Sequence, residues 1–282
     1  MSSFFRYPGG KSKFQSKIVD ALLIRSLETG LQYREPFFGG GGVGLKFLEI
    51  WTHVKDVWIN DRDVGIACLW SSVLAYPQLL INEIGTFEPH PDKFYSFKEE
   101  LLALDRSSSW IPSDPFDIVD IGFKKLVVHQ LSFSGLGTKA GGPLGGKSQE
   151  SKYKIDCRWS PNYLIKKIRR FSDMFSDFNV QYGYCTALDF SVLVQDDTRK
   201  AILYLDPPYF NKGSELYQYS FTIEEHEYLA HLLERSSHDW VLSYDDCPEI
   251  RKLYSWASIE KINANYTIRN ARVKSELIIC PE

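Results

Sequence analysis

The chain has 282 residues, enough for one large domain or two small ones. Its content of 44% hydrophobic and 24% charged residues is typical of an ordinary globular protein and excludes a disordered or fibrous chain. The formal net charge of -3 excludes a protein that is basic over its whole surface, so nucleic-acid binding would need a local patch.

The five cysteines are scattered, include no CxxC pair and indicate reduced thiols rather than a zinc site. The histidines are equally dispersed, so no metal is expected. The N-terminus lacks the apolar core of a signal peptide, and no run approaches the ~20 apolar residues of a membrane span. The sequence therefore predicts a soluble, cytoplasmic protein with no membrane part.

The first 51 residues are typical of the opening of a Rossmann-like unit. A turn at Tyr7–Lys11 precedes a predicted helix over 12–26, and a short strand over 32–37 follows. The glycine run of residues 39–44 then leads into a helix over 44–51, and its glycines would let a cofactor approach the helix N-terminus closely. A flexible turn without a ligand is the alternative for the glycine run.

A second strand is predicted over 54–60, and two acids follow it, Asp61 and Asp63. A carboxylate at the end of the second strand can accept hydrogen bonds from both hydroxyls of a nucleoside ribose. The alternative is that one of the two acids caps the next helix. With the glycine run in register, the pattern favours Asp61 as the ribose ligand.

From residue 64 to 159 the alternation of strands and helices stops. Helices are predicted over 65–84, 92–105 and 116–131, and a glycine-rich loop follows over 132–147. Basic residues of the loop and of the segment after it are the candidates for contacts with a polyanion: Lys139, Lys147, Lys152 and Lys154. A mainly helical insertion with a basic loop suits a polyanionic partner, although a disordered surface loop has the same composition.

The alternating pattern resumes after residue 160, so the α/β domain is predicted as 1–63 plus 160–282, interrupted by the insertion 64–159. A basic helix over 161–178 is either a solvated face or part of a combined patch with the loop. Strands follow at 180–184, 201–205 and 240–244, with helices at 188–194, 222–234 and 247–254. Segments 258–264 and 275–279 close the chain as a predicted antiparallel pair.

The strand over 201–205 is apolar throughout and therefore predicted to be buried on both faces. Two prolines forbid it to continue, so Asp206 stands at the carboxyl end of the strand, where ligands bind in open α/β sheets. An acid, the carbonyl of Pro207 and the ring of Tyr209 suit a flat molecule that carries an amine. The alternative is a strand-ending turn with a capping acid and a core tyrosine.

A competing motif is the stretch 141–148, which matches the P-loop pattern with Lys147 as its lysine. A phosphate-binding loop needs a buried strand before the first glycine and an apolar helix after the last residue. The flanking residues are polar on both sides, which disfavours a nucleotidase.

Taken in order, these stretches resemble the Dam-type family of adenine-specific DNA methyltransferases. The motifs that carry the resemblance are Tyr7-Pro8-Gly9-Gly10-Lys11, Glu35 to Val43, Asn60-Asp61, Leu188-Asp189-Phe190, Asp206-Pro207-Pro208-Tyr209 and the closing segment Arg269 to Ile279. The similarity spans nearly the whole catalytic part. It implies a Rossmann-like methyltransferase domain with a target-recognition insertion.

The resemblance also implies S-adenosylmethionine as the methyl donor and double-stranded DNA as the substrate. The implied cofactor-binding residues are Tyr7, Lys11, Glu35, Gly39, Asp61, Phe190 and Asp206. Tyr7 and Lys11 would hold the methionine part, Asp61 the ribose, and Phe190 would lie near the adenine.

In the same family pattern the carboxylate of Asp206 and the carbonyl of Pro207 would accept hydrogen bonds from the target amine, and Tyr209 would stack on the base. The adenine must be flipped out of the duplex, and no metal is required.

Two departures leave finer points open. Arg62 stands where the family commonly has an apolar residue, and the loop lacks the Asn, Arg and Tyr pattern of relatives that read GATC, so the recognition sequence is open. A cognate restriction nuclease is a further expected partner. The alternatives are a different acceptor (a cytosine amine, RNA or a protein amide), a catalytically inactive DNA-binding protein of the same fold, and the P-loop nucleotidase.

Overall fold

The computed structural model describes residues 3, 11–27, 30–104, 111–211, 219–266 and 272–282. Tyr7, one of the predicted cofactor-binding residues, lies outside the described residues. The chain divides into two compact units. The first contains residues 11–60 and 189–282, and the second contains residues 61–188.

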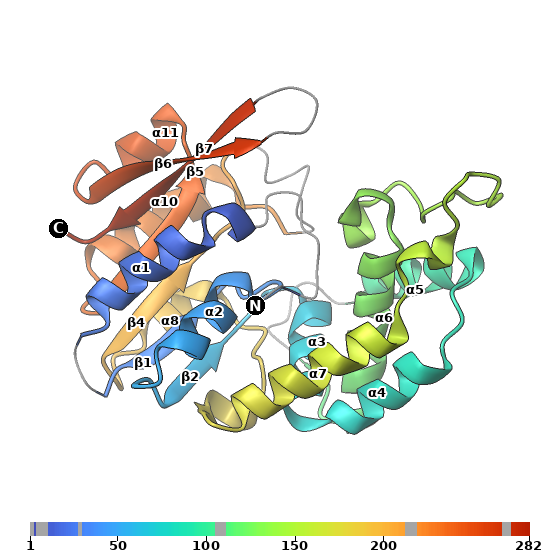
Figure 1. Cartoon of the computed structure of the whole chain (residues 1–282). Coiled ribbons are helices and arrows are strands. Elements are labelled where there is room, and N and C mark those ends of the chain that lie inside the picture. The colour runs from blue at the N-terminus through green and yellow to red at the C-terminus, as the bar shows by residue number, and fades with distance from the viewer. Residues whose placement is uncertain (1–2, 4–10, 28–29, 105–110, 212–218, 267–271) are drawn as a thin grey trace. The chain divides into compact units, whose positions relative to one another are not determined.

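The first unit is built on a sheet whose strands alternate with helices along the chain (Figure 1). Its strands are, in spatial order, β2 (Asp56–Ile59), β1 (Gln32–Glu35), β4 (Ala201–Leu205), β5 (Asp239–Asp245), β7 (Arg272–Cys280) and β6 (Ser258–Tyr266). Strands β2, β1, β4 and β5 are parallel, and β7 is antiparallel to both β5 and β6. The strand order reverses between β1 and β4, and such a switch point opens a crevice for a ligand at the carboxyl ends of the strands.

Helices cover both faces of this sheet (Figure 1). On one face lie α1 (Gln15–Arg25), which follows a 3-10 turn η1 (Lys11–Lys13), and α2 (Gly42–Ile50). The other face packs against α8 (Phe190–Gln195), α10 (Ile223–Glu234) and α11 (Pro248–Leu253). All five residues of β4 are buried, which confirms the strand predicted from their apolar character.

The second unit is mainly helical. Its elements are α3 (Val64–Ala75), α4 (Pro77–Thr86), α5 (Pro91–Ala103), α6 (Pro115–Leu131), the 3-10 turns η2 (Phe133–Gly135), η3 (Gly137–Lys139) and η4 (Ile155–Arg158), α7 (Pro161–Phe175), the short strand β3 (Asn179–Val180) and η5 (Gln181–Gly183). Helices α3 and α6 approach closely at Gly122, where an added Cβ would lie 2.7 Å from the backbone of Leu69. A glycine is therefore required at that contact.

Two predicted elements are wrong in detail. The single helix predicted over 65–84 is two helices, α3 and α4, which meet at an angle of 111°, because Pro77 lacks the N–H that a continuous helix needs. The strand predicted over 180–184 ends at Val180, because Tyr182 adopts a φ of 61°, outside the extended region.

Within the described chain no single helix is long and apolar enough to cross a membrane, and only the bent pair α3–α4 reaches the length and composition together.

The P-loop pattern at 141–148 lacks the structure that such a loop needs. The turn η3 precedes the pattern where a buried strand would be needed. Within the pattern, Pro143 forms a single bridge with Ser132. The described residues between Ser148 and Ile155 form no helix. The structure therefore agrees with the sequence context in disfavouring a nucleotidase.

A buried arginine ties the switch-point strands to the segment that leads into β4. Arg34 on β1 has no exposed surface, and its guanidinium donates to the carbonyl oxygens of Leu193 (2.8 Å), Asp196 (2.6 Å) and Arg199 (3.1 Å). The Asp196 carboxylate lies 3.6 Å from Nη2. A buried guanidinium with this many acceptors satisfies carbonyls that no helix or strand would otherwise pair.

Replacing this arginine should be far more costly than replacing an exposed one. We expect Arg34→Leu to lower the free energy of unfolding by about 3–5 kcal/mol, since the carbonyls of Leu193 and Arg199 lose their charged donor and the Asp196 carboxylate loses its ion pair. Arg251→Leu, which removes a surface pair with Asp246, should cost less than about 1 kcal/mol. Urea denaturation followed by circular dichroism measures both, and equal losses would contradict the structural role of Arg34.

Candidate active site

The turn after β4 is held at the carboxyl edge of the sheet by its neighbour β5. The backbone N–H groups of Phe210 and Asn211 donate to the two carboxylate oxygens of Asp245, at 3.1 and 3.3 Å. Pro207, Pro208 and Tyr209 are buried, whereas the side chain of Asp206 keeps 24% of its surface exposed. The turn therefore presents one partly exposed carboxylate from a fixed backbone.

Lys11 lies at the centre of this site. Its ammonium is 2.9 Å from Asp206 Oδ1, 2.8 Å from Glu276 Oε2 and 2.9 Å from the hydroxyl oxygen of Tyr209, so three partners match its three N–H donors. The Tyr209 hydroxyl in turn donates to Glu276 Oε1 at 2.7 Å. The four side chains come from η1, from the turn after β4 and from β7, which are distant in sequence.

Burial and the charges of this cluster shift the pKa values of Lys11 and Asp206. Burial disfavours the charged form of Lys11, but the carboxylates of Asp206 and Glu276 outweigh it and hold the pKa of Lys11 well above its usual value. Burial raises the pKa of Asp206, the Lys11 ammonium opposes that shift, and the repulsion from Glu276 adds to it. Lys11 is thus a permanent cation, and Asp206 is a carboxylate that protonates more readily than an exposed one.

A second chain of hydrogen bonds reaches the same oxygen of Asp206. The Ser243 hydroxyl donates to Asp206 Oδ1 at 3.2 Å, and the hydroxyls of Tyr204 and Ser243 are 2.9 Å apart. Tyr204 and Ser243 are both fully buried in adjacent strands. Among the described residues every hydrogen bond found for this carboxylate goes to Oδ1, so Oδ2 is the oxygen available to a ligand.

The glycine turn forms a second part of the site, at the end of β1. Glu35 is buried there and accepts a 2.6 Å hydrogen bond from the Tyr33 hydroxyl. Gly39 and Gly41 have φ values of 49° and 67°, which glycine adopts without strain. At Gly44 in α2 an added Cβ would stand 2.0 Å from Glu35 Oε2, so the carboxylate lies against the helix because this residue has no side chain.

Phe190 begins α8 and is 3% exposed, in a cluster of aromatic rings. Its ring centroid lies 5.7 Å from that of Phe37 in the glycine motif and 5.2 Å from that of Phe221. Phe190, a predicted cofactor contact, thus lies next to the predicted glycine motif, and its ring also packs in the hydrophobic core.

The two acids after β2 have different environments within the second unit. Asp63 caps α3 by accepting from the Ile66 N–H at 3.3 Å, and it also pairs with Lys125. Asp61 accepts from the Asp63 N–H at 2.9 Å and donates its own N–H to Thr186. The helix cap that was the alternative role for one of the two acids is therefore made by Asp63.

The four lysines predicted to contact DNA are all exposed and lie in the second unit. Lys139 ends η3, Lys152 stands 6.0 Å from the centre of the Tyr153 ring, and Lys154 donates to the carbonyl of Gln149. Lys147 lies in a bend between Lys139 and Lys152. None of the four belongs to the unit that contains Asp206.

Three residues of the site had no predicted role: Glu276, Ser243 and Tyr204. Glu276 belongs to the predicted closing strand, where an acid next to Leu277, Ile278 and Ile279 is unusual for a buried strand. That contrast is the signal that sequence inspection offers. Ser243 and Tyr204 offer none, since small polar and aromatic residues are common in strands.

The fold and the site together define a class. A parallel α/β sheet has a glycine turn after its first strand and a partly exposed carboxylate at the switch point, an arrangement suited to an enzyme that acts with a nucleoside-containing cofactor.

The chain matches the model of the D12 class N6 adenine-specific DNA methyltransferases over residues 7–268, and it belongs to that family. It is a DNA methyltransferase that transfers a methyl group from S-adenosylmethionine to N6 of adenine. No curated protein sequence matches the chain significantly. The family, the activity, the cofactor and the DNA substrate predicted from the sequence motifs are thus confirmed.

The contact between Gly44 and Glu35 can be tested with a matched glycine. We expect Gly44→Ala to lower the free energy of unfolding by about 1–3 kcal/mol, because the methyl group would overlap the buried carboxylate. Gly42→Ala, at the start of the same helix, meets nothing within 4 Å and should be neutral or slightly stabilising. Thermal and urea denaturation measure both variants. An undisturbed Gly44→Ala protein would contradict the close approach.

Proposed function

We propose that Asp206 and Pro207 hold the target adenine amine for methyl transfer. Oδ2 of Asp206 and the carbonyl oxygen of Pro207 would each accept one N–H of the amine. This turns the nitrogen lone pair out of conjugation with the ring and toward the sulfonium methyl. The observation that carries the proposal is the partly exposed carboxylate of Asp206, of which Oδ1 is held by Lys11 and Ser243.

The proposed step balances without a metal. The amine nitrogen forms a bond to the methyl carbon while the carbon–sulfur bond breaks, which leaves S-adenosylhomocysteine. Positive charge develops on N6 as the bond forms, and the adjacent carboxylate stabilises it. One N6 proton then passes to water, which leaves neutral N6-methyladenine. The Pro207 carbonyl has a fixed direction because its neighbours are buried and the turn is anchored by Asp245.

Further residues are proposed to bind the cofactor: Tyr7, Lys11, Glu35, Gly39, Asp61 and Phe190. Lys11 is proposed to hold Asp206 in place and also to bind the methionine part of the cofactor. All three of its N–H donors already have protein partners, so the second task needs one of them to be released. If Tyr209 leaves its place beside Lys11, one donor loses its acceptor, and the methionine carboxylate of the cofactor can take that donor. Asp61 would accept from the ribose hydroxyls, and Phe190 would contact the adenine.

Tyr209 is proposed to stack on the flipped adenine. Tyr209 is 4% exposed, and its hydroxyl donates to Glu276 and accepts from Lys11. Stacking therefore requires the side chain to leave these hydrogen bonds when the base arrives. Extrusion of the base costs unpairing energy, which the stacking and the bonds to Asp206 and Pro207 offset.

The insertion 64–159 is proposed to recognise the target sequence, with Lys139, Lys147, Lys152 and Lys154 on the DNA backbone. Its glycine-rich loop lies in a unit of its own helices, apart from the unit that contains Asp206. A cognate restriction nuclease would cut the same sequence only when it is unmethylated, and such a partner stays a prediction.

Methyl transfer from labelled S-adenosylmethionine to unmethylated genomic DNA tests the role of Asp206. We expect Asp206→Ala to reduce the rate by at least about 10²-fold, since it removes the carboxylate that stabilises the positive charge developing on N6. The exposed Asp20→Ala on α1 should keep the wild-type rate. Mass spectrometry of digested nucleosides identifies N6-methyladenine as the product, and calorimetry checks that the variant still binds the cofactor. A near-normal rate in Asp206→Ala would refute the proposed role.

The pH dependence of the single-turnover rate tests how Asp206 is held. Asp206 acts as a carboxylate, so the rate should fall as the pH drops through its pKa, which burial raises. Ser243→Ala removes a hydrogen bond that favours the ionised form, so the acid limb should move to higher pH. Glu276→Gln removes a repelling charge, so the limb should move to lower pH. Ser71→Ala, a buried serine in α3, should leave the limb in place, and shifts of the same sign in Ser243→Ala and Glu276→Gln would contradict the arrangement.

A further inference from the structure

The cations of this chain are concentrated in one segment. Residues 147–170 contain eight Lys or Arg side chains and two acidic ones, a local charge of +6 in a chain whose net charge is -3. Four of the cations belong to α7, and the only acid within that helix is Asp173. The chain thus carries the local basic patch that its overall charge does not reveal.

Helix α7 has two opposite faces. Leu164, Ile168, Phe171 and Phe175 are buried, and the Phe171 ring lies 5.6 Å from that of Trp70 in α3. Packing of this apolar face against α3 and α4 fixes the helix in the second unit. The polar face is therefore presented on a rigid element rather than on a loop.

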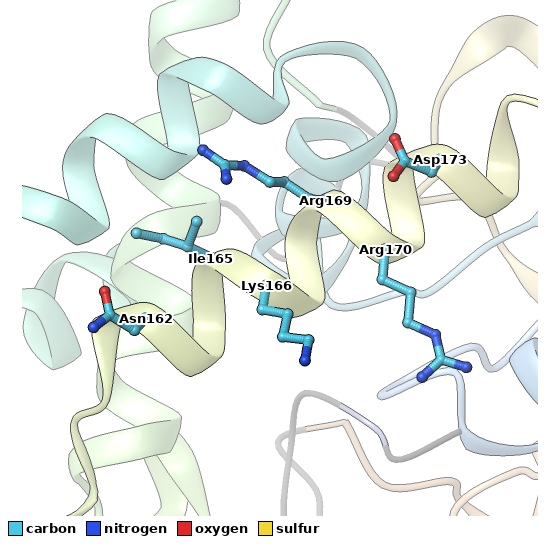
Figure 2. A pocket seen from close by; sticks show the side chains of 6 residues that line it. All are labelled: Asn162, Ile165, Lys166, Arg169, Arg170 and Asp173. Carbon is cyan, nitrogen blue, oxygen red and sulfur yellow. The ribbon is translucent and has the colours of Figure 1, made fainter.

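The polar face forms a groove of about 520 Å³, and its lining residues among those that the structure describes all belong to α7: Asn162, Ile165, Lys166, Arg169, Arg170 and Asp173. Figure 2 shows Lys166 and Arg170 leaving the helix on one side and Arg169 leaving it on the other, so the three cations flank the groove. Lys166 and Arg170 are one helical turn apart, about 6 Å along the axis. Two positive charges at this spacing suit an extended anion with several charged groups better than a single small anion.

Lys167, the fourth cation of the helix, has partners within the protein. Lys167 donates to the carbonyl of Ser3, 2.5 Å away, and stands 4.8 Å from the centre of the Tyr163 ring. Lys166 and Arg169 are exposed, and neither forms an ion pair with an acid in the part of the chain that the structure describes. Exposed cations on a rigid face lose little conformational freedom when they meet phosphates.

We propose that Lys166, Arg169 and Arg170 of α7 form a binding site for the phosphate backbone of duplex DNA, separate from the glycine-rich loop. The site binds DNA independently of its sequence and adds affinity without selecting the target. Phosphate contacts position a protein on the duplex, whereas base contacts specify the sequence. This inference rests on DNA being the substrate and not on the proposed roles of Asp206 or Tyr209.

The test compares two triple variants of the full chain with equal changes in charge. Lys166→Gln, Arg169→Gln and Arg170→Gln together alter α7, and Lys17→Gln, Arg235→Gln and Lys252→Gln together alter exposed positions of the first unit. Fluorescence anisotropy measures the affinity for a duplex of defined sequence without adenine methylation as a function of salt. A third variant, Lys166→Arg, Arg169→Lys and Arg170→Lys, keeps the charges.

For the α7 variant we expect an affinity at least about tenfold weaker at low salt. The log–log salt slope should be smaller by about 2–3, since each phosphate that the protein no longer neutralises reduces it by about 0.9. The affinity should fall by the same factor for unrelated sequences, with an unchanged rate at saturating DNA. The charge-retaining variant should bind like wild type.

An unchanged salt slope in the α7 variant, or an equal weakening in the control variant, would overturn the proposal. A loss of discrimination between sequences at constant affinity would also overturn it, because that result indicates base contacts. Wild-type methylation of the same DNA, measured in parallel, reports separately on the catalytic proposal, so failure of one does not imply failure of the other.

Discussion

The active site depends on one buried ammonium group held between two carboxylates. Lys11 has little contact with solvent, so its charge must be neutralised where it stands. Asp206 does so from the turn after β4, and Glu276 does so from β7. The bond to Glu276 joins residues 265 positions apart, near the two ends of the chain. The same three charges that hold the Asp206 carboxylate in place therefore tie the first 3-10 turn to β7, so a change to the candidate site is also a change to the fold.

The two oxygens of Asp206 have different roles in this arrangement: Oδ1 is bound by protein groups, and Oδ2 is the proposed acceptor for the substrate. Oδ1 is fixed by an ammonium and by a hydroxyl that belongs to a buried pair in β4 and β5, so the carboxylate cannot rotate freely. In the proposed mechanism Oδ2 is the oxygen that accepts from the target amine. A carboxylate oriented in advance loses less entropy when it meets a substrate amine, and its effect on the developing charge is larger than that of a mobile group.

Local chemistry explains which parts could be predicted from the sequence. Strand β4 was predicted with its observed bounds because its five apolar residues are buried on both faces and two prolines end it. Glu276 could not be assigned, because its role depends on the antiparallel register of β7, which places it beside Asp245 on β5. Pairings between distant strands leave no local pattern. The break at Pro77 was visible in the sequence, but the apolar periodicity on both sides of it masked the change of direction.

Net charge is a poor guide to how this protein meets DNA, because charge of both signs is distributed unevenly. Outside residues 147–170 the chain carries an excess of acids, which repel a polyanion, while the segment 147–170 attracts it. With the proposed phosphate contacts of α7, this uneven charge favours encounters with the duplex through the segment 147–170. Because the cations of α7 stand on a helix held by Trp70 and its neighbours, their position is set by the core of that unit. The apolar face of α7 thus determines where the charge is presented, which links the packing of the second unit directly to the capture of the substrate.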